Sequence, residues 1–238
     1  MSEAGLLVDR PAEGVTRLRL DRPDTRNAID RGLAQALFDA LGEPDAAVVI
    51  LAGGTDAFCS GMDLHLDPSE RVAVSDLLYQ VYERMLANPV PIVASIAGHA
   101  VGGGAQLAIA SDLRVAGPSA RIRFVGAGHG LAVGAWGLGS LVGRGRAMDL
   151  LLSTRPVEAD EALAIGLVDR VEDDPDAAAL ELATGIAALE GPAVARVKRL
   201  VADAGLLGSL RREREENHAS WTGEIPDAAL PSATRDDG

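Results

Sequence analysis

The sequence has few aromatic residues, a single cysteine, and no long uninterrupted apolar run. Aromatic residues make up only 3% of the 238 residues, so alanine and branched aliphatic side chains must build most of the core. The lone Cys59 excludes an intramolecular disulfide and fits a reducing compartment. The apolar stretches are broken well short of a membrane span, and residues 1–10 lack the pattern of a signal peptide. We therefore expect a soluble, cytoplasmic protein.

Basic residues are scarce as well, and the net charge is −13. Nucleic-acid binding depends on neutralisation of phosphates by Lys and Arg, so the charge balance argues against it. The only lysine, Lys198, lies far from every Gly-rich segment, which excludes a P-loop. The four histidines are scattered, and no H-E-x-x-H or G-x-S-x-G motif occurs. We expect no metal site and no separate cofactor.

Apolar periodicity predicts alternating strands and helices, which is typical of an α/β fold. Strands are expected over residues 15–20, 47–51, 92–96, 113–116, 122–124 and 167–171. Helices are expected over residues 30–41, 72–86, 103–110, 158–165, 176–189 and 192–218. Loops are expected over residues 53–63, 98–104 and 126–139, and a frayed tail over 226–238.

Two of the predicted buried strands run into turns of small residues. Residues 48–53 lead to 59–63, and residues 92–98 lead to 102–104. Such turns can leave backbone N–H groups pointing outward, and a helix N-terminus adds partial positive charge. Two such donors aimed at one point would stabilise an oxyanion. The local pattern by itself favours plain sharp turns with close helix packing, and the oxyanion-hole interpretation stays open as the alternative at this stage.

Six segments follow the order and spacing of the crotonase, or enoyl-CoA hydratase/isomerase, family. They are LDRPDTRNA (20–28), AFCSGMDL (57–64), PIVASIAG (91–98), VGGG (101–104), SDLRV (111–115) and EALAIGLVD (161–169). The sequence resembles this family from residue 15 to about 172. The resemblance implies a spiral core of ββα units over residues 1–190. It also implies a C-terminal helical region, residues 191–238, that builds a homotrimer or a dimer of trimers.

The resemblance implies a site for an acyl-CoA thioester, with coenzyme A as part of the substrate. The backbone N–H groups of Met62 and Gly103 would donate to the thioester oxygen and so form an oxyanion hole. The side chains expected along or near the CoA path are Arg26, Ala28, Ser60, Asp63, Leu64 and His65.

The sequence departs from the family at both of its acidic positions. The first is Gln106, three residues after Gly103, and the second aligns with Gly126. An amide cannot exchange a proton near neutral pH. No Asp or Glu occurs from residue 113 to 148, so a shift of the alignment does not recover the acid. We therefore predict an acyl-CoA-binding protein that is not an efficient hydratase.

Two further side chains belong to this prediction. The sequence resembles a family branch with Gln at the first acidic position and a Trp, here Trp136, in the following loop. Trp136 would close over an acyl chain or serve as a core aromatic. His129 is the best remaining titratable group near the expected acyl site.

Two alternatives to a binding protein stay open. One is a crotonase-fold enzyme with other acyl-CoA chemistry, such as isomerisation, thioester hydrolysis or C–C cleavage. Its base would be His129, or a carboxylate from the C-terminal helices or from a neighbouring subunit. The other, more remote, is a structural subunit of an oligomer.

Overall fold

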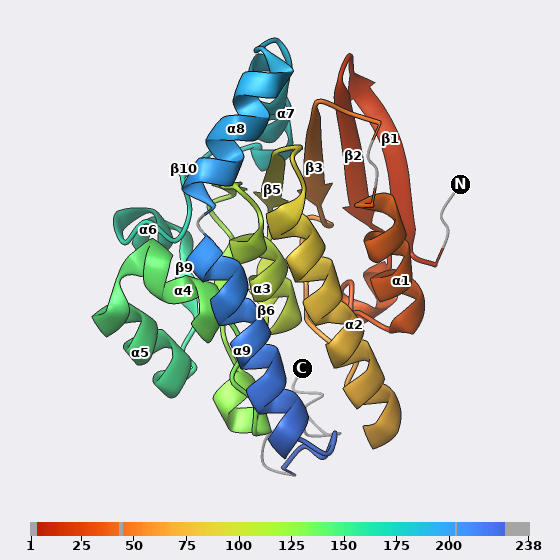
Figure 1. Ribbon diagram of the computed structural model, residues 1–238, viewed down its shortest axis with the longest axis vertical. Coiled ribbons are helices and arrows are strands. Elements are labelled where there is room, and N and C mark those ends of the chain that lie inside the picture. The colour runs from red at the N-terminus through yellow and green to blue at the C-terminus, as the bar shows by residue number, and fades with distance from the viewer. Residues whose placement is uncertain (1–3, 43–44, 203, 227–238) are drawn as a thin grey trace, which may run out of the picture.

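A parallel-rich β-sheet forms the central layer of the computed structural model, which describes residues 4–42, 45–202 and 204–226 (Figure 1). Within these residues the sheet has six strands in the order β1-β2-β3-β5-β7-β10. Its strands are β1 (Leu6–Ala12), β2 (Val15–Leu20), β3 (Val48–Ala52), β5 (Ile92–Ile96), β7 (Leu113–Ala116) and β10 (Arg170–Val171). β1 pairs antiparallel with β2, and the other pairs are parallel. β3 and β5 are buried along their whole length, as expected for parallel strands covered on both faces.

A second sheet is made of very short strands in the order β4-β6-β8-β9. They are β4 (Ala57–Cys59), β6 (His99–Val101), β8 (Arg121–Arg123) and β9 (Val157–Glu158). β3-β4, β5-β6 and β7-β8 each pass from the large sheet to the small one before a helical segment, so the predicted spiral of ββα units is confirmed. The prediction of plain loops over residues 53–63 and 98–104 is wrong. Three-residue strands show no periodicity, and pairing between distant segments creates them.

Helices pack around the two sheets (Figure 1). They are α1 (Arg31–Ala40), α2 (Pro68–Ala87), α3 (Gly103–Ala110), α4 (Ala135–Val142), α5 (Arg144–Ser153), α6 (Ala159–Ala164), α7 (Pro175–Ala187), α8 (Gly191–Val201) and α9 (Ala204–Ser220). The short 3-10 turns are η1 (Pro23–Thr25) and η2 (Gly126–His129). Asp30 caps α1 by accepting the N–H of Leu33 at 2.9 Å.

Two segments differ from the sequence prediction by more than a shift of a helix end. The expected continuous helix over 192–218 is wrong, because α8 ends at Val201 and the next residue, Ala202, has a non-helical ψ of 75°. The expected loop over 126–139 contains η2 and the start of α4. Of the predicted frayed tail, residues 227–238 lie outside the described part of the chain.

The chain's only lysine anchors α8 to the central sheet. Lys198 Nζ donates to the carbonyl oxygens of Met85 at 3.0 Å and Val90 at 2.9 Å, and it pairs with Asp112 at 2.8 Å. The Asp112 carboxylate also accepts the N–H of Ile92, the first residue of β5, at 2.7 Å. Burial lowers the pKa of Lys198, while the nearby carboxylate opposes that shift.

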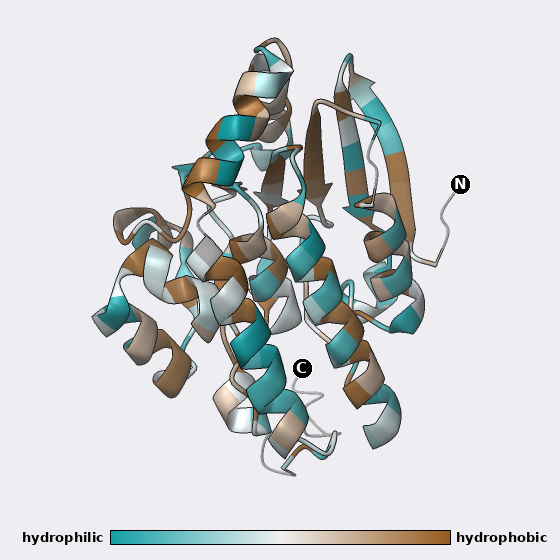
Figure 2. Ribbon diagram, viewed as in Figure 1, coloured by the Kyte–Doolittle hydropathy of each residue, from teal (hydrophilic) through white to brown (hydrophobic). Residues whose placement is uncertain are grey.

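The opposite face of α8 is apolar and uncovered in the single chain. Val197, Leu200 and Val201 are 60%, 78% and 79% exposed. Figure 2 shows hydrophobic residues interleaved with hydrophilic ones along this helix. Among the residues that the structure describes, no single helix has the length and apolar composition of a membrane span. α7 and α8 reach both only as a pair, which bends by 113°.

Candidate functional site

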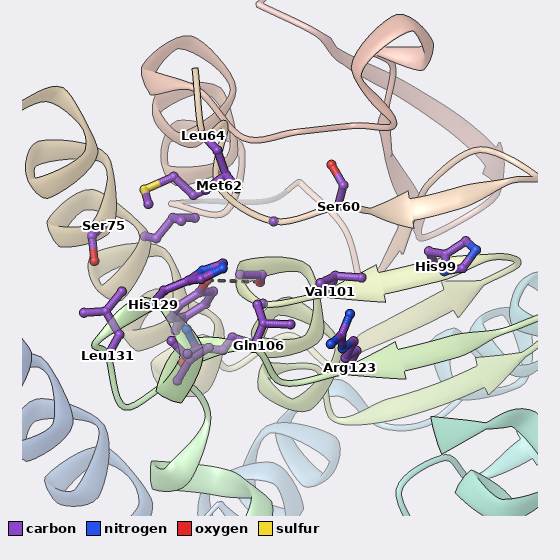
Figure 3. A pocket seen from close by; sticks show the side chains of 18 of the residues that line it. Ser60, Met62, Leu64, Ser75, His99, Val101, Gln106, Arg123, His129 and Leu131 are labelled. Carbon is purple, nitrogen blue, oxygen red and sulfur yellow. Dashed lines mark hydrogen bonds between the residues drawn. The ribbon is translucent and has the colours of Figure 1, made fainter. Parts of the chain in front are cut away.

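A pocket of about 350 Å³ lies where the N-terminus of α3 meets α2, the segment after β4 and the loop around η2. Figure 3 shows Met62 and Leu64 on one loop, Ser75 on α2, and His129 and Leu131 on a second loop, around a common space. The predicted site residues that line it are Arg26, Ser60, Met62, Leu64, Gly103, Gln106, Gly126 and His129. The structure thus gathers segments more than a hundred residues apart in the sequence into one wall.

Four predicted site residues do not line this pocket: Ala28, Asp63, His65 and Trp136. Ala28 is buried, and the backbone N–H of Asp63 donates to Ile29 O at 2.9 Å. The His65 side chain is 97% exposed and lies 3.1 Å from the Asp63 carboxylate. Trp136 is 5% exposed and lies behind the pocket wall, in the core.

The backbone of Met62 is set by a short parallel bridge to Ile29. Ile29 N–H donates to Gly61 O at 2.7 Å, and Asp63 N–H donates to Ile29 O at 2.9 Å. Because successive N–H groups of an extended chain point to opposite sides, the Met62 N–H points away from Ile29. That direction leaves it available on the pocket side.

The second backbone donor is the first residue of α3. Gly103 stands at the helix N-terminus, where N–H groups have no acceptor within the helix. A Cβ placed on Gly103 would lie 3.6 Å from Met62 N, and one on Gly61 would lie 3.2 Å from Gly103 N. The two N–H groups therefore border the same small space.

Glycines allow the two turns to approach this closely. Gly61 has a φ of +93°, and a Cβ there would come within 2.7 Å of Val101 O. A Cβ on Gly104 would come within 2.2 Å of Cys59 O. The end of β4 and the start of α3 are thus in backbone contact, and a side chain at either glycine would separate the paired donors.

Gln106 lines the pocket one helical turn after Gly103 and is 4% exposed. Its Oε1 accepts the indole Nε1–H of Trp136 at 2.8 Å. An indole N–H can only donate, so the bonded amide atom must be the oxygen. Trp136 therefore supports Gln106 from behind.

Gly126, the residue predicted to align with the second acidic position of the family, has no room for a side chain. A Cβ there would lie 2.5 Å from Val133 Cβ and 2.7 Å from Leu131 O. A carboxylate at this position would displace the loop that forms this wall. No Asp or Glu occurs among the described residues that line the pocket.

Sequence reasoning missed two tyrosines and an asparagine of the pocket. Tyr82 Oη donates to Gly103 O at 3.1 Å and so holds the first turn of α3. Tyr79 Oη donates to the Glu213 carboxylate at 2.8 Å and accepts from Asn217 Nδ2 at 2.7 Å. Burial raises the pKa of both tyrosines, so both remain neutral near pH 7. Their spacing of three on a predicted helix, which puts them on one face, was the available signal.

Glu213 of α9 fixes the loop that precedes α4. Its Oε1 accepts the N–H of Gly134 at 3.1 Å, and its Oε2 accepts the N–H of Trp136 at 2.9 Å. Burial raises the pKa of Glu213, and hydrogen bonds from Tyr79 and the backbone partly oppose this. Glu213 does not line the pocket. This C-terminal carboxylate is thus engaged behind the wall, whereas His129 lies on the pocket surface.

The described residues contain no group of three or more His, Cys, Asp and Glu side chains that could hold a metal ion. The polar groups that face the pocket are backbone N–H groups, hydroxyls, amides, histidines and arginines. Hydrogen-bond donors of these kinds can polarise the carbonyl group of a ligand by donating to its oxygen.

Comparison with known proteins agrees with this arrangement. A family model described as enoyl-CoA hydratase/isomerase matches residues 10–215. The chain belongs to the enoyl-CoA hydratase/isomerase, or crotonase, family, which confirms the predicted membership. Over 202 residues, 82% of each chain, it is 38% identical to the probable enoyl-CoA hydratase echA6 of Mycobacterium tuberculosis (strain CDC 1551 / Oshkosh).

Solved structures show the same fold. An enoyl-CoA hydratase/isomerase from Xanthobacter autotrophicus Py2 superposes with a TM-score of 0.84 at 28% identity, covering 94% of this chain and 89% of that one. A monofunctional enoyl CoA isomerase from M. smegmatis superposes with a TM-score of 0.73 at 30% identity, covering 91% and 99%.

Proposed function

We propose that this protein binds acyl-CoA thioesters, holds the thioester oxygen between the N–H groups of Met62 and Gly103, and hydrates enoyl-CoA inefficiently or not at all. The observation that carries this proposal is the pairing of two backbone donors in a pocket whose described lining has no carboxylate. The donors suit a thioester carbonyl, because backbone N–H groups stabilise negative charge as it develops on oxygen.

Hydration requires more than a polarised carbonyl. One group must take a proton from water, and one must deliver a proton to the α-carbon. Gln106 and Gly126 can do neither, and each missing acid–base group typically removes a factor of about 10²–10⁴ in rate. The protein is therefore expected to bind the thioester although it lacks the groups that the hydratase reaction needs.

Two arginines of the pocket lining, Arg26 and Arg123, suit the phosphates of coenzyme A. An arginine attracts phosphate at contact distance even though the whole chain is acidic. Ser60 and Leu64 lie along the same wall, as the family resemblance implies for the CoA path.

Calorimetric titration and an ultraviolet hydration assay test the proposal together. We expect butyryl-CoA or longer acyl-CoAs to bind, free coenzyme A to bind more weakly, and crotonyl-CoA not to be hydrated at a rate typical of hydratases. Hydratase-like turnover of crotonyl-CoA would refute the claim about the missing acids. Failure to bind any CoA thioester would refute the ligand class and leave only a structural role.

The position of His129 favours a second candidate, an enzyme with another acyl-CoA reaction. His129 lies on the pocket surface, and an imidazole can act as a base near neutral pH. Turnover of an acyl-CoA by isomerisation, thioester hydrolysis or C–C cleavage would support this candidate. The same activity would have to be lost in the His129→Ala variant.

We further propose that the chain assembles as a homotrimer or a dimer of trimers through its C-terminal region. The exposed apolar residues of α8 support this, together with Met148 and Leu152 on α5, which are 50% and 67% exposed. Light scattering after size-exclusion chromatography is expected to give three or six times the mass of one chain. A monomer at micromolar concentration would contradict the assembly.

A further inference from the structure

The amide of Gln106 is held in one orientation. Its Oε1 is taken by the indole of Trp136, which is not a pocket-lining residue, so the Nε2 end is turned away from that partner. The described residues offer Nε2 no hydrogen-bond partner, although Gln106 is only 4% exposed. Because Gln106 lines the pocket, its two Nε2 N–H groups face that space.

Three neighbouring polar side chains of the pocket, those of Tyr79, Tyr82 and Asn217, are already hydrogen-bonded within the protein. Tyr79 Oη and Asn217 Nδ2 bond at 2.7 Å, and Asn217 Oδ1 accepts the N–H of Ala132 at 2.9 Å. Tyr82 Oη is bonded to Gly103 O. The Gln106 amide is therefore the side-chain donor that the wall of α3 presents to a ligand.

Its place on the helix fixes where a ligand would meet it. Gln106 is three residues after Gly103 on α3. Residues at this spacing lie on one face of a helix, with Cβ positions about 5–6 Å apart. If the thioester oxygen binds at the Gly103 N–H, the amide faces the acyl chain a few bonds from the carbonyl. That is the region of the third acyl carbon.

We propose that the pocket selects acyl-CoA thioesters that carry a hydrogen-bond acceptor oxygen on the third acyl carbon, as in 3-oxoacyl-CoA. This inference rests on the proposed function. A saturated acyl chain would bury the Nε2 donor without a partner, which is costly, whereas an oxygen at that carbon would satisfy it. Apolar side chains such as Leu78, Leu131 and Val133 line the same pocket and suit the remainder of an aliphatic chain.

The test compares ligands of equal chain length by calorimetry: butyryl-CoA against 3-oxobutyryl-CoA, and decanoyl-CoA against 3-oxodecanoyl-CoA. We expect each 3-oxo ligand to bind about fivefold to tenfold more tightly than its saturated partner, the size of one net hydrogen bond. Equal affinities within both pairs would overturn the inference while leaving acyl-CoA binding intact. Absence of binding by all four would refute the proposed function instead.

Three variants test whether the Gln106 amide is the group that donates to the acyl oxygen. Gln106→Met keeps an unbranched side chain of similar size without the amide, and it should bind both members of a pair equally. Trp136→Phe removes the indole N–H that orients the amide and should reduce the preference. Gln35→Met, on an exposed glutamine of α1, is the matched control and should keep it. A preference that survives in Gln106→Met would assign the selectivity to another group and overturn the inference.

Discussion

Gly103→Val is expected to weaken acyl-CoA binding about 100-fold, or about 2.8 kcal/mol at 1.4 kcal/mol per factor of ten, without unfolding the protein. A Cβ at Gly103 would lie 3.3 Å from Tyr82 Oη and 3.6 Å from Met62 N. The methyl groups of valine extend further into the space that both backbone donors border. These methyl groups would occupy the position of the thioester oxygen and shield both N–H groups from the ligand.

The fold should tolerate this change. Gly103 does not require a positive φ, and it stands at the first position of α3, where a side chain breaks no helical hydrogen bond. The matched control is Gly185→Ala on α7, where a Cβ would meet nothing within 4 Å. Calorimetry with butyryl-CoA measures the effect, and thermal unfolding confirms the fold. An unchanged dissociation constant in Gly103→Val would refute the paired-donor site.

Sequence periodicity predicted the strands and helices that are long enough to show it. The strand at 92–96 and the helix at 103–110 match β5 and α3 residue for residue. β1, β4, β6 and β9 were missed. β4, β6 and β9 have only two or three residues each, and β1 is largely exposed, so none shows a clear apolar alternation. The fold class therefore came from the longer elements and the ordered motifs together.

The candidate site was predictable only where it belongs to local motifs. Met62, Gly103 and Gln106 lie in such motifs and line one pocket in the structure. Asn217 was not predictable, because α9 reaches the pocket through tertiary packing that no local pattern records. Nor did the sequence reveal that Trp136 donates a hydrogen bond to Gln106. The two residues are 30 positions apart and lie on different helices, so their contact produces no periodic pattern in the sequence.

Glu213→Ala is expected to destabilise the protein by about 3 kcal/mol, because it leaves buried donors without an acceptor. These donors are the N–H groups of Gly134 and Trp136; the hydroxyl of Tyr79 loses its nearer acceptor and keeps only Ala132 O at 3.2 Å. Urea unfolding of the full chain measures the loss. Glu215→Ala, on an exposed residue of the same helix, should change the free energy of unfolding by less than about 0.5 kcal/mol. Equal effects of the two variants would show that the buried network adds nothing to stability.

The same carboxyl makes stability depend on pH in a defined direction. Burial raises the pKa of Glu213 above 4.5, so the folded state binds this proton more tightly than the unfolded state does. The resulting stabilisation is fully present below the unfolded pKa and is lost as the pH rises through the folded pKa. Glu213→Gln does not titrate there. The free energy of unfolding of the unmodified protein, minus that of Glu213→Gln, should therefore fall across this window and then level off. Urea unfolding at a series of pH values measures it, and a difference that rises with pH would contradict a burial-dominated carboxyl.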